Sequence, residues 1–165
     1  MANYVETVLI NEGLSAFNTH TFLRNDGVTG ELVNQPLIYA SELTPPLGAG
    51  QYMSIWEVWY SVTNFTIQFS WATLTNSDPF MVLAPGVDSR MKFHRFGGLV
   101  DSSGLYAQGG LLMSTTGFNS TASYGHIILR CRKHENTAPA YKIVGQPRGL
   151  QPGVTYSNTN SGTQQ

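Results

Sequence analysis

At 165 residues the chain has the length of one domain, which is enough to build a hydrophobic core without cross-links. Charged residues make up 12% of the chain, about half of the usual ~25%, and Ser, Thr, Asn, Gln and 17 Gly supply polarity instead. The one cysteine, Cys131, excludes an internal disulfide. Because there is neither an apolar run of about 18 residues nor the basic start of a signal peptide, we expect no membrane partner.

The charges are segregated along the sequence. Residues 1–89 contain eight acidic residues and one basic residue, Arg24, whereas residues 90–165 contain eight basic and two acidic residues. Two interpretations remain open. Either strands from the two halves interleave within one sandwich, or opposite patches of neighbouring subunits meet.

The first fifty residues predict strands and turns. Two short apolar runs, 4–10 and 17–23, are separated by a turn at 11–13. The first run lacks one-sided alternation, which is typical of a strand or arm that is buried on both sides, by its own domain or by a neighbour. Turn residues fill 25–30, and prolines punctuate the loop-like stretch 31–50.

The stretch 51–80 contains all three Trp and predicts two core strands. In its second half, apolar residues of one parity alternate with polar ones: Phe65, Ile67, Phe69 and Trp71. In its first half the opposite parity is apolar: Trp56, Val58, Tyr60 and Val62. The change of phase at Thr63-Asn64 predicts a turn or a bulge. Trp59 shares its parity with Glu57, so we expect its side chain to point outward, toward a partner or ligand.

Further short strands are predicted at 80–83, 91–96, 111–116 and 126–133. In the last of these Ile127, Leu129 and Cys131 face one way, and Ile128, Arg130 and Arg132 face the other. Regular spacing of short strands and turns predicts an all-β fold, a single jelly-roll-like antiparallel β-sandwich with extended N- and C-terminal arms. We divide it into an N-terminal arm with the first strands (1–50), the sandwich core (51–135) and an extended tail (136–165).

The sequence predicts no catalytic, cofactor or metal site. Four histidines and Cys131 lack the paired spacing of a metal site, and basic neighbours surround Cys131. A Gly-x-Ser-x-Gly motif and a phosphate-binding loop are both absent from the sequence. A strongly basic tail is absent too, so we expect no direct binding of nucleic acid. We therefore expect a non-enzymatic protein.

Across residues 53–135 the motifs MSIWEVWYSV, FTIQFSWAT, PFMVLAPG, MKFHRFGGL, GGLLMSTTGF and YGHIILRCRK follow one another. This order resembles a family of small phage virion proteins of the jelly-roll head-decoration, or cement, type. The resemblance implies a structural protein that is made in the host cytoplasm and binds the major capsid protein on the outer surface of the virion. It also implies a homodimer or homotrimer. The candidate contact residues are Tyr4, Val5, Trp59, Arg130, Arg132 and Tyr156.

Two alternatives remain open. A receptor- or glycan-binding knob or fibre module would have an aromatic-lined concave site with convergent polar groups. A jelly-roll capsid subunit would build the genome-enclosing shell from this protein alone.

Overall fold

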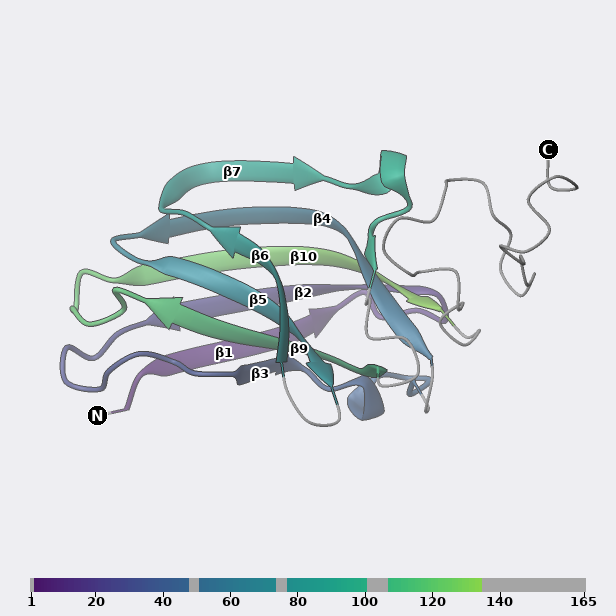
Figure 1. The fold of residues 1–165 in the computed structure, drawn as a ribbon, viewed down its shortest axis with the longest axis horizontal. Helices are drawn as coiled ribbons and strands as arrows, with labels where there is room; N and C mark the ends of the chain where they lie inside the picture. The colour runs from purple at the N-terminus through teal and green to yellow at the C-terminus, as the bar shows by residue number, and fades with distance from the viewer. Residues whose placement is uncertain (1, 48–50, 74–76, 101–106, 135–165) are drawn as a thin grey trace, which may run out of the picture.

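The computed structural model describes residues 2–47, 51–73, 77–100 and 107–134, which form a two-layer β-sandwich (Figure 1). The strands are β1 (Tyr4–Ile10), β2 (Ala16–Arg24), β3 (Gln35–Ile38), β4 (Tyr52–Thr63), β5 (Thr66–Thr73), β6 (Ser77–Leu83), β7 (Gly86–Lys92), β8 (Leu99–Val100), β9 (Ala107–Thr116) and β10 (Tyr124–His134). Two single-turn 3-10 helices, η1 (Ala40–Glu42) and η2 (His94–Phe96), lie between strands. Within these ranges, no helix has the length and apolar character needed to cross a membrane.

The strands pair in a nested order. One layer is a six-stranded sheet with the order β1-β2-β10-β4-β7, in which β8 also pairs with β4, and the other has the order β3-β9-β5-β6. Every pair is antiparallel, and β2 pairs with β10, β3 with β9, β4 with β7 and β5 with β6. A long hairpin rolled across two sheets in this way is a jelly roll, so the predicted fold class is confirmed.

The residues before position 50 contribute to both sheets. β2 lies between β1 and β10, and β3 is an edge of the four-stranded sheet. Because β2 and β3 pair with strands from the second half of the chain, position 50 does not separate an arm from the sandwich. The outermost N-terminal element is the edge strand β1. The predicted tail, 136–165, lies outside the described residues.

The core is formed between the inner faces of the two sheets. The predicted alternation of β5 is confirmed, because Ile67, Phe69 and Trp71 are all buried. A turn at Asn64, whose φ is 68°, follows β4 as expected. It joins no hairpin, however, because β4 and β5 belong to different sheets. The turn carries the chain from one layer to the other.

A bulge in β4 overturns one sequence expectation. Glu57 pairs with Arg130 while Ile55 pairs with Cys131, so Trp56 is an extra residue in its strand. The buried apolar side chains of β4 are therefore odd-numbered up to Ile55 and even-numbered from Val58 onward. The expectation that Trp56 belongs to the core is wrong for this reason, and its ring is only partly buried.

Candidate functional site

The outer face of the six-stranded sheet, the side turned away from the core, carries exposed aromatic side chains. Alternation along its strands sends every second side chain to this face. Tyr4, Phe22, Trp59 and Tyr124 are exposed there by 40 to 56%. On the other sheet, the exposed positions in the middle of β5 and β6 are Gln68 and Val82, which lie opposite each other and are not aromatic. The two outer surfaces differ, and the aromatic one is the candidate site.

Four side chains near the β1 edge form what we call the aromatic patch: Tyr4, Val8, Phe22 and Tyr124, all exposed. The strand register brings them together, because Arg24 lies opposite both Tyr4 and Tyr124, and Phe22 lies two positions from Arg24. Phe22 also stacks on His126, with ring centroids 4.6 Å apart. An apolar group on adjacent strands of a rigid sheet is typical of a surface that contacts another protein.

A pair of histidines borders the aromatic patch. His20 Nε2 lies 2.7 Å from His126 Nε2, at hydrogen-bonding distance. Such a bond requires one ring nitrogen to donate and the other to accept, so at least one ring is neutral. Burial, together with the neighbouring His20, lowers the pKa of His126 below its usual value. The lowered pKa favours the neutral form of His126 at neutral pH, while the charged residues Glu6 and Arg24 lie among the patch residues on β1 and β2.

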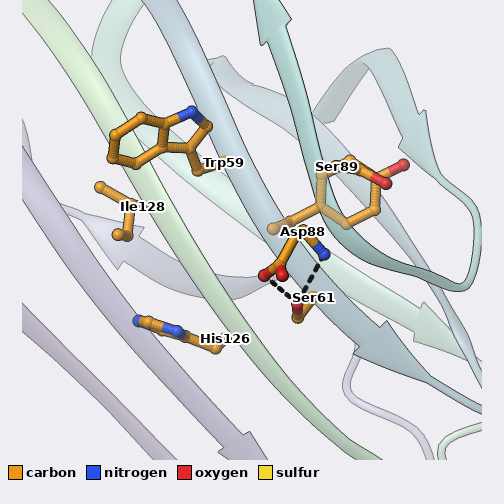
Figure 2. Close-up of a pocket in the computed structure, with 7 residues that line it drawn as sticks. Trp59, Ser61, Asp88, Ser89, His126 and Ile128 are labelled. Carbon is orange, nitrogen blue, oxygen red and sulfur yellow. Dashed lines mark hydrogen bonds between the residues drawn. The ribbon is translucent and has the colours of Figure 1, made fainter.

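Toward the β7 edge a shallow pocket of about 230 Å³ opens, which we call the Trp59 pocket (Figure 2). It is lined by Trp59, Tyr60, Ser61, Asp88, Ser89, His126 and Ile128. Ser61 Oγ accepts a hydrogen bond from the Asp88 backbone N–H at 2.9 Å and contacts the Asp88 carboxylate at 3.4 Å. Asp88 has a φ of 50°, a left-handed conformation that is rare outside glycine. An aromatic wall thus faces hydroxyl and carboxylate groups.

A second pocket of about 280 Å³, which we call the basic pocket, lies beside the Trp59 pocket, two residues further along β4, β7 and β10. It is lined by Trp56, Glu57, Arg90, Lys92, His94 and Arg130. Arg90 Nε donates to Glu57, and this bond holds the pKa of the Glu57 carboxyl below its usual range, with the charges of Lys92 and Arg130 acting in the same direction. Three basic side chains therefore lie around one carboxylate.

Arginine side chains stack on both tryptophans of β4. The Arg132 guanidinium lies 3.6 Å from the ring centroid of Trp56, and the Arg90 guanidinium lies 4.6 Å from that of Trp59. Such cation–π contacts orient the guanidinium planes while leaving N–H groups free at their edges.

The structure places four of the candidate contact residues on one face of the sheet, but not in one cluster, because Tyr4 lies at the β1 edge and Arg130 and Arg132 lie toward the far end of β10. Tyr4, Trp59, Arg130 and Arg132 all lie on the outer face. Val5 does not, because its side chain packs against the core. Tyr156 is outside the described residues. Sequence reasoning missed Phe22, His20 and Asp88; the one-sided alternation of β2 was the available signal for the first two, and nothing in the sequence indicated Asp88.

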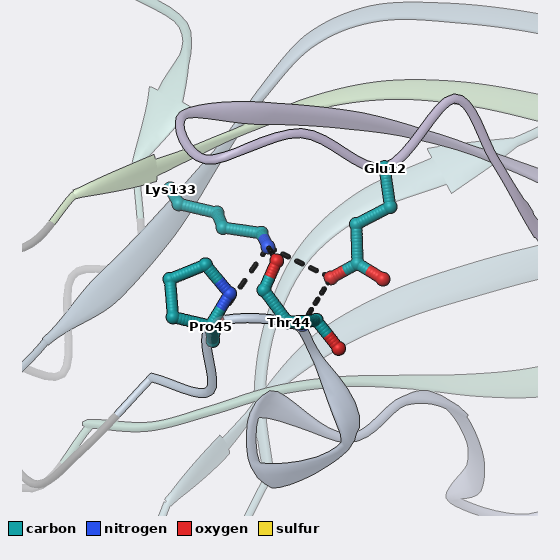
Figure 3. Close-up of polar contacts among 4 residues, drawn as sticks. All are labelled: Glu12, Thr44, Pro45 and Lys133. Atoms are coloured by element: carbon teal, nitrogen blue, oxygen red, sulfur yellow. Dashed lines mark hydrogen bonds and ion pairs between the residues drawn. The ribbon is translucent and has the colours of Figure 1, made fainter.

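Lys133 does not belong to the basic pocket, although the sequence places it beside Arg130 and Arg132. Its side chain is 1% exposed and points to the other side of β10. Nζ donates to Glu12 Oε1 and to the Thr44 carbonyl, both at 2.7 Å (Figure 3). Glu12 also accepts from the Thr44 backbone N–H. The Lys133 hydrogen bond lowers the pKa of the Glu12 carboxyl, and the Thr44 N–H acts in the same direction.

Apart from the His20–His126 pair, the histidines and Cys131 are dispersed. Cys131 is buried, and burial raises the pKa of its thiol. His134 stacks on Tyr52 and bonds Ser54 Oγ at 2.8 Å, while His94 lines the basic pocket. In the described part of the chain no three His, Cys, Asp or Glu side chains converge as a metal would require.

Comparisons with models of known protein families, with curated proteins and with solved structures found no match for this chain.

Proposed function

We propose that the protein is a non-enzymatic virion protein of a phage, a decoration or cement protein that binds the major capsid protein on the outside of the head. The observation that carries the proposal is the aromatic patch on a rigid sheet face. The resemblance of residues 53–135 to head-decoration proteins gives the class of partner. The patch, on the β1 and β2 side of the outer face, gives the surface that would contact it.

The patch has the physical character of a docking surface. Exposed Tyr and Phe side chains lose unfavourable contact with water when a partner covers them, and they are enriched among the residues that dominate interface energies. The lowered pKa of the neighbouring His126 favours its neutral form at neutral pH, which lessens the cost of covering this part of the face. A protein that binds only the assembled lattice stabilises the shell by mass action.

Self-association would use the edge of β1. Among the described residues, this seven-residue strand pairs with β2 on one side and with no strand on the other. A second copy that paired β1 with β1 about a two-fold axis would extend the sheet and place two aromatic patches on one continuous face. Such a homodimer would dock bivalently at a two-fold position of the shell, which raises the apparent affinity. A homotrimer would occupy a three-fold position instead.

The test uses capsids of the parent phage that lack this protein because its gene is disrupted. Purified protein is added, and its binding and the melting temperature of the capsids are measured. We expect saturable binding and a higher capsid melting temperature. Failure to bind assembled capsids would contradict the proposal, and formation of complete shells by the purified protein alone would favour the genome-enclosing capsid subunit instead.

A further inference from the structure

We propose that the β7 side of the outer face binds an acidic saccharide, with a hydroxylated sugar ring in the Trp59 pocket and its carboxylate or sulfate group in the basic pocket. The inference draws on different observations from those that support capsid docking. The aromatic patch lies on β1, β2 and the start of β10, whereas the two pockets lie over β10, β4 and β7. The two regions meet at His126, which lines the Trp59 pocket and stacks on Phe22 of the patch.

Trp59 provides the platform for the sugar ring. Its side chain is 43% exposed and forms a wall of the pocket rather than part of the core. Ile128 lies opposite Trp59 in the register of β10 and extends the apolar surface. The Arg90 guanidinium, 4.6 Å from the ring centroid, orients the indole from the neighbouring strand. The C–H face of a pyranose ring is apolar, so a flat, preorganised aromatic surface suits it.

Asp88 and Ser61 provide the polar groups that recognise sugar hydroxyls. The Ser61 Oγ bond to the backbone N–H of Asp88 fixes the local left-handed backbone. From the described residues the Asp88 carboxylate receives one long contact, at 3.4 Å from Ser61 Oγ, so it has acceptor capacity left for a ligand in the pocket. A left-handed aspartate at a pocket rim is the kind of costly conformation that clusters at functional sites.

The basic pocket provides the site for the anionic group, and its distance from the Trp59 pocket suits a disaccharide. Moving two residues along each strand leads from Trp59 to Glu57, from Ile128 to Arg130 and from Arg90 to Lys92. Two residues of an extended strand span about 7 Å, so a ligand of disaccharide length reaches both pockets. Within the described residues Lys92 and Arg130 have no ion-pair partner, and the guanidinium fork of Arg130 matches a carboxylate or sulfate.

The distribution of charge favours a saccharide over an acidic peptide or a nucleic acid. One pocket contains a carboxylate and hydroxyl groups, and the other contains the cations. A chain with an anion at every unit would place negative charge beside Asp88, where it is repelled. A ligand with a hydroxylated part and an anionic part meets the matching groups in both pockets.

Binding is measured by titration calorimetry on the full chain with four probes: a disaccharide with one carboxylated unit (cellobiouronate), a disaccharide with one sulfated unit (lactose 6′-sulfate), the neutral disaccharide maltose, and hexaglutamate as the peptide probe. We expect one of the two acidic saccharides to bind at least about tenfold more tightly than maltose and hexaglutamate. Trp59→Ala and Arg130→Gln should each weaken that binding about tenfold or more. The matched controls Tyr39→Ala and Arg24→Gln, an exposed aromatic residue and an exposed arginine outside the two pockets, should leave it unchanged.

Three results would overturn the inference. One is the absence of binding by both acidic disaccharides. Another is acidic-saccharide binding that survives both Trp59→Ala and Arg130→Gln. The third is hexaglutamate binding of equal strength that depends on Arg130 but not on Trp59, which would assign the basic pocket to an acidic protein segment. Circular dichroism melting of each variant establishes that it is folded.

Discussion

Lys133 Nζ lies 2.7 Å from Glu12 Oε1, and this ion pair connects the end of β10 to the turn between β1 and β2. The Lys133 side chain is 1% exposed and that of Glu12 is 20% exposed, so the two partners are unequally buried. The ammonium also bonds the Thr44 carbonyl, and Glu12 receives the Thr44 N–H. Three separate segments therefore depend on one pair of charges.

This asymmetry predicts different costs for removing either partner. Glu12→Gln leaves a buried ammonium without its counter-charge and should lower the free energy of unfolding by about 2 to 3 kcal/mol, below the usual cost of breaking a fully buried pair because Glu12 is partly hydrated. Lys133→Met removes the buried charge and keeps the apolar stem, so it should cost about 1 kcal/mol or less. Urea denaturation measures both values. A larger loss for Lys133→Met than for Glu12→Gln would contradict this description of the ion pair.

The His20–His126 pair predicts that stability falls on mild acidification. Because the folded-state pKa of His126 is lowered, the unfolded chain binds the proton more readily. The contribution of this group is complete above the ordinary pKa of about 6.5 and is lost as the pH falls from there toward the lowered value. The melting temperature should decrease between pH 7.5 and pH 5, and the decrease should be smaller in His126→Phe. An equal decrease in that variant would assign the effect to other groups.

Buried Cys131 predicts a thiol that does not react while the protein is folded. Its side chain is inaccessible, and burial raises the pKa of the thiol, so the reactive thiolate is scarce. An aromatic disulfide reagent at pH 8 should therefore modify it only at the rate at which the protein unfolds, and quickly in urea. Rapid stoichiometric modification of the native protein would show that β10 opens locally.

The sequence predicts the parts of the fold that depend on local alternation. The buried set of β5 follows from Ile67, Phe69 and Trp71, and the inward face of β10 follows from Ile127, Leu129 and Cys131. The error at Trp56 arises because a single bulge residue reverses the parity of a strand, and no local pattern marks it. The pairing of β2 with β10 also escaped sequence reasoning, since it joins residues about a hundred positions apart.

The sequence predicted the outward direction of single side chains in the candidate site, but it did not predict how those side chains are arranged on the face. Trp59, Arg130 and Arg132 have outward parity, and the structure places them on one face with Tyr4. Lys133 shares its parity with Cys131, so its inward direction follows from the same alternation. The His20–His126 contact and the position of Asp88 depend on register and on an unusual backbone angle, which a sequence does not reveal.

The charge segregation along the sequence has a partial structural explanation. Lys133 from the basic half pairs with Glu12 from the acidic half, and Arg90 pairs with Glu57. Interleaved strands thus neutralise some charges within one subunit. Lys92 and Arg130 keep a local excess of positive charge in the basic pocket, so Arg130→Gln should raise the pKa of Glu57 toward its usual value. Nuclear magnetic resonance titration of the Glu57 carboxyl measures this shift, and an unchanged pKa would show that the Arg130 charge is screened by solvent.

The proposed docking through the aromatic patch is tested most directly by comparing capsid binding of the wild type with that of the double variant Tyr4→Ser, Tyr124→Ser. These two side chains are 53% and 56% exposed, so their replacement should leave the melting temperature of the protein unchanged. We predict that affinity for capsids lacking the protein falls at least about thirtyfold, while Tyr39→Ser, an exposed tyrosine outside the patch, binds like the wild type. Equal binding by the folded double variant and the wild type would contradict docking through this patch.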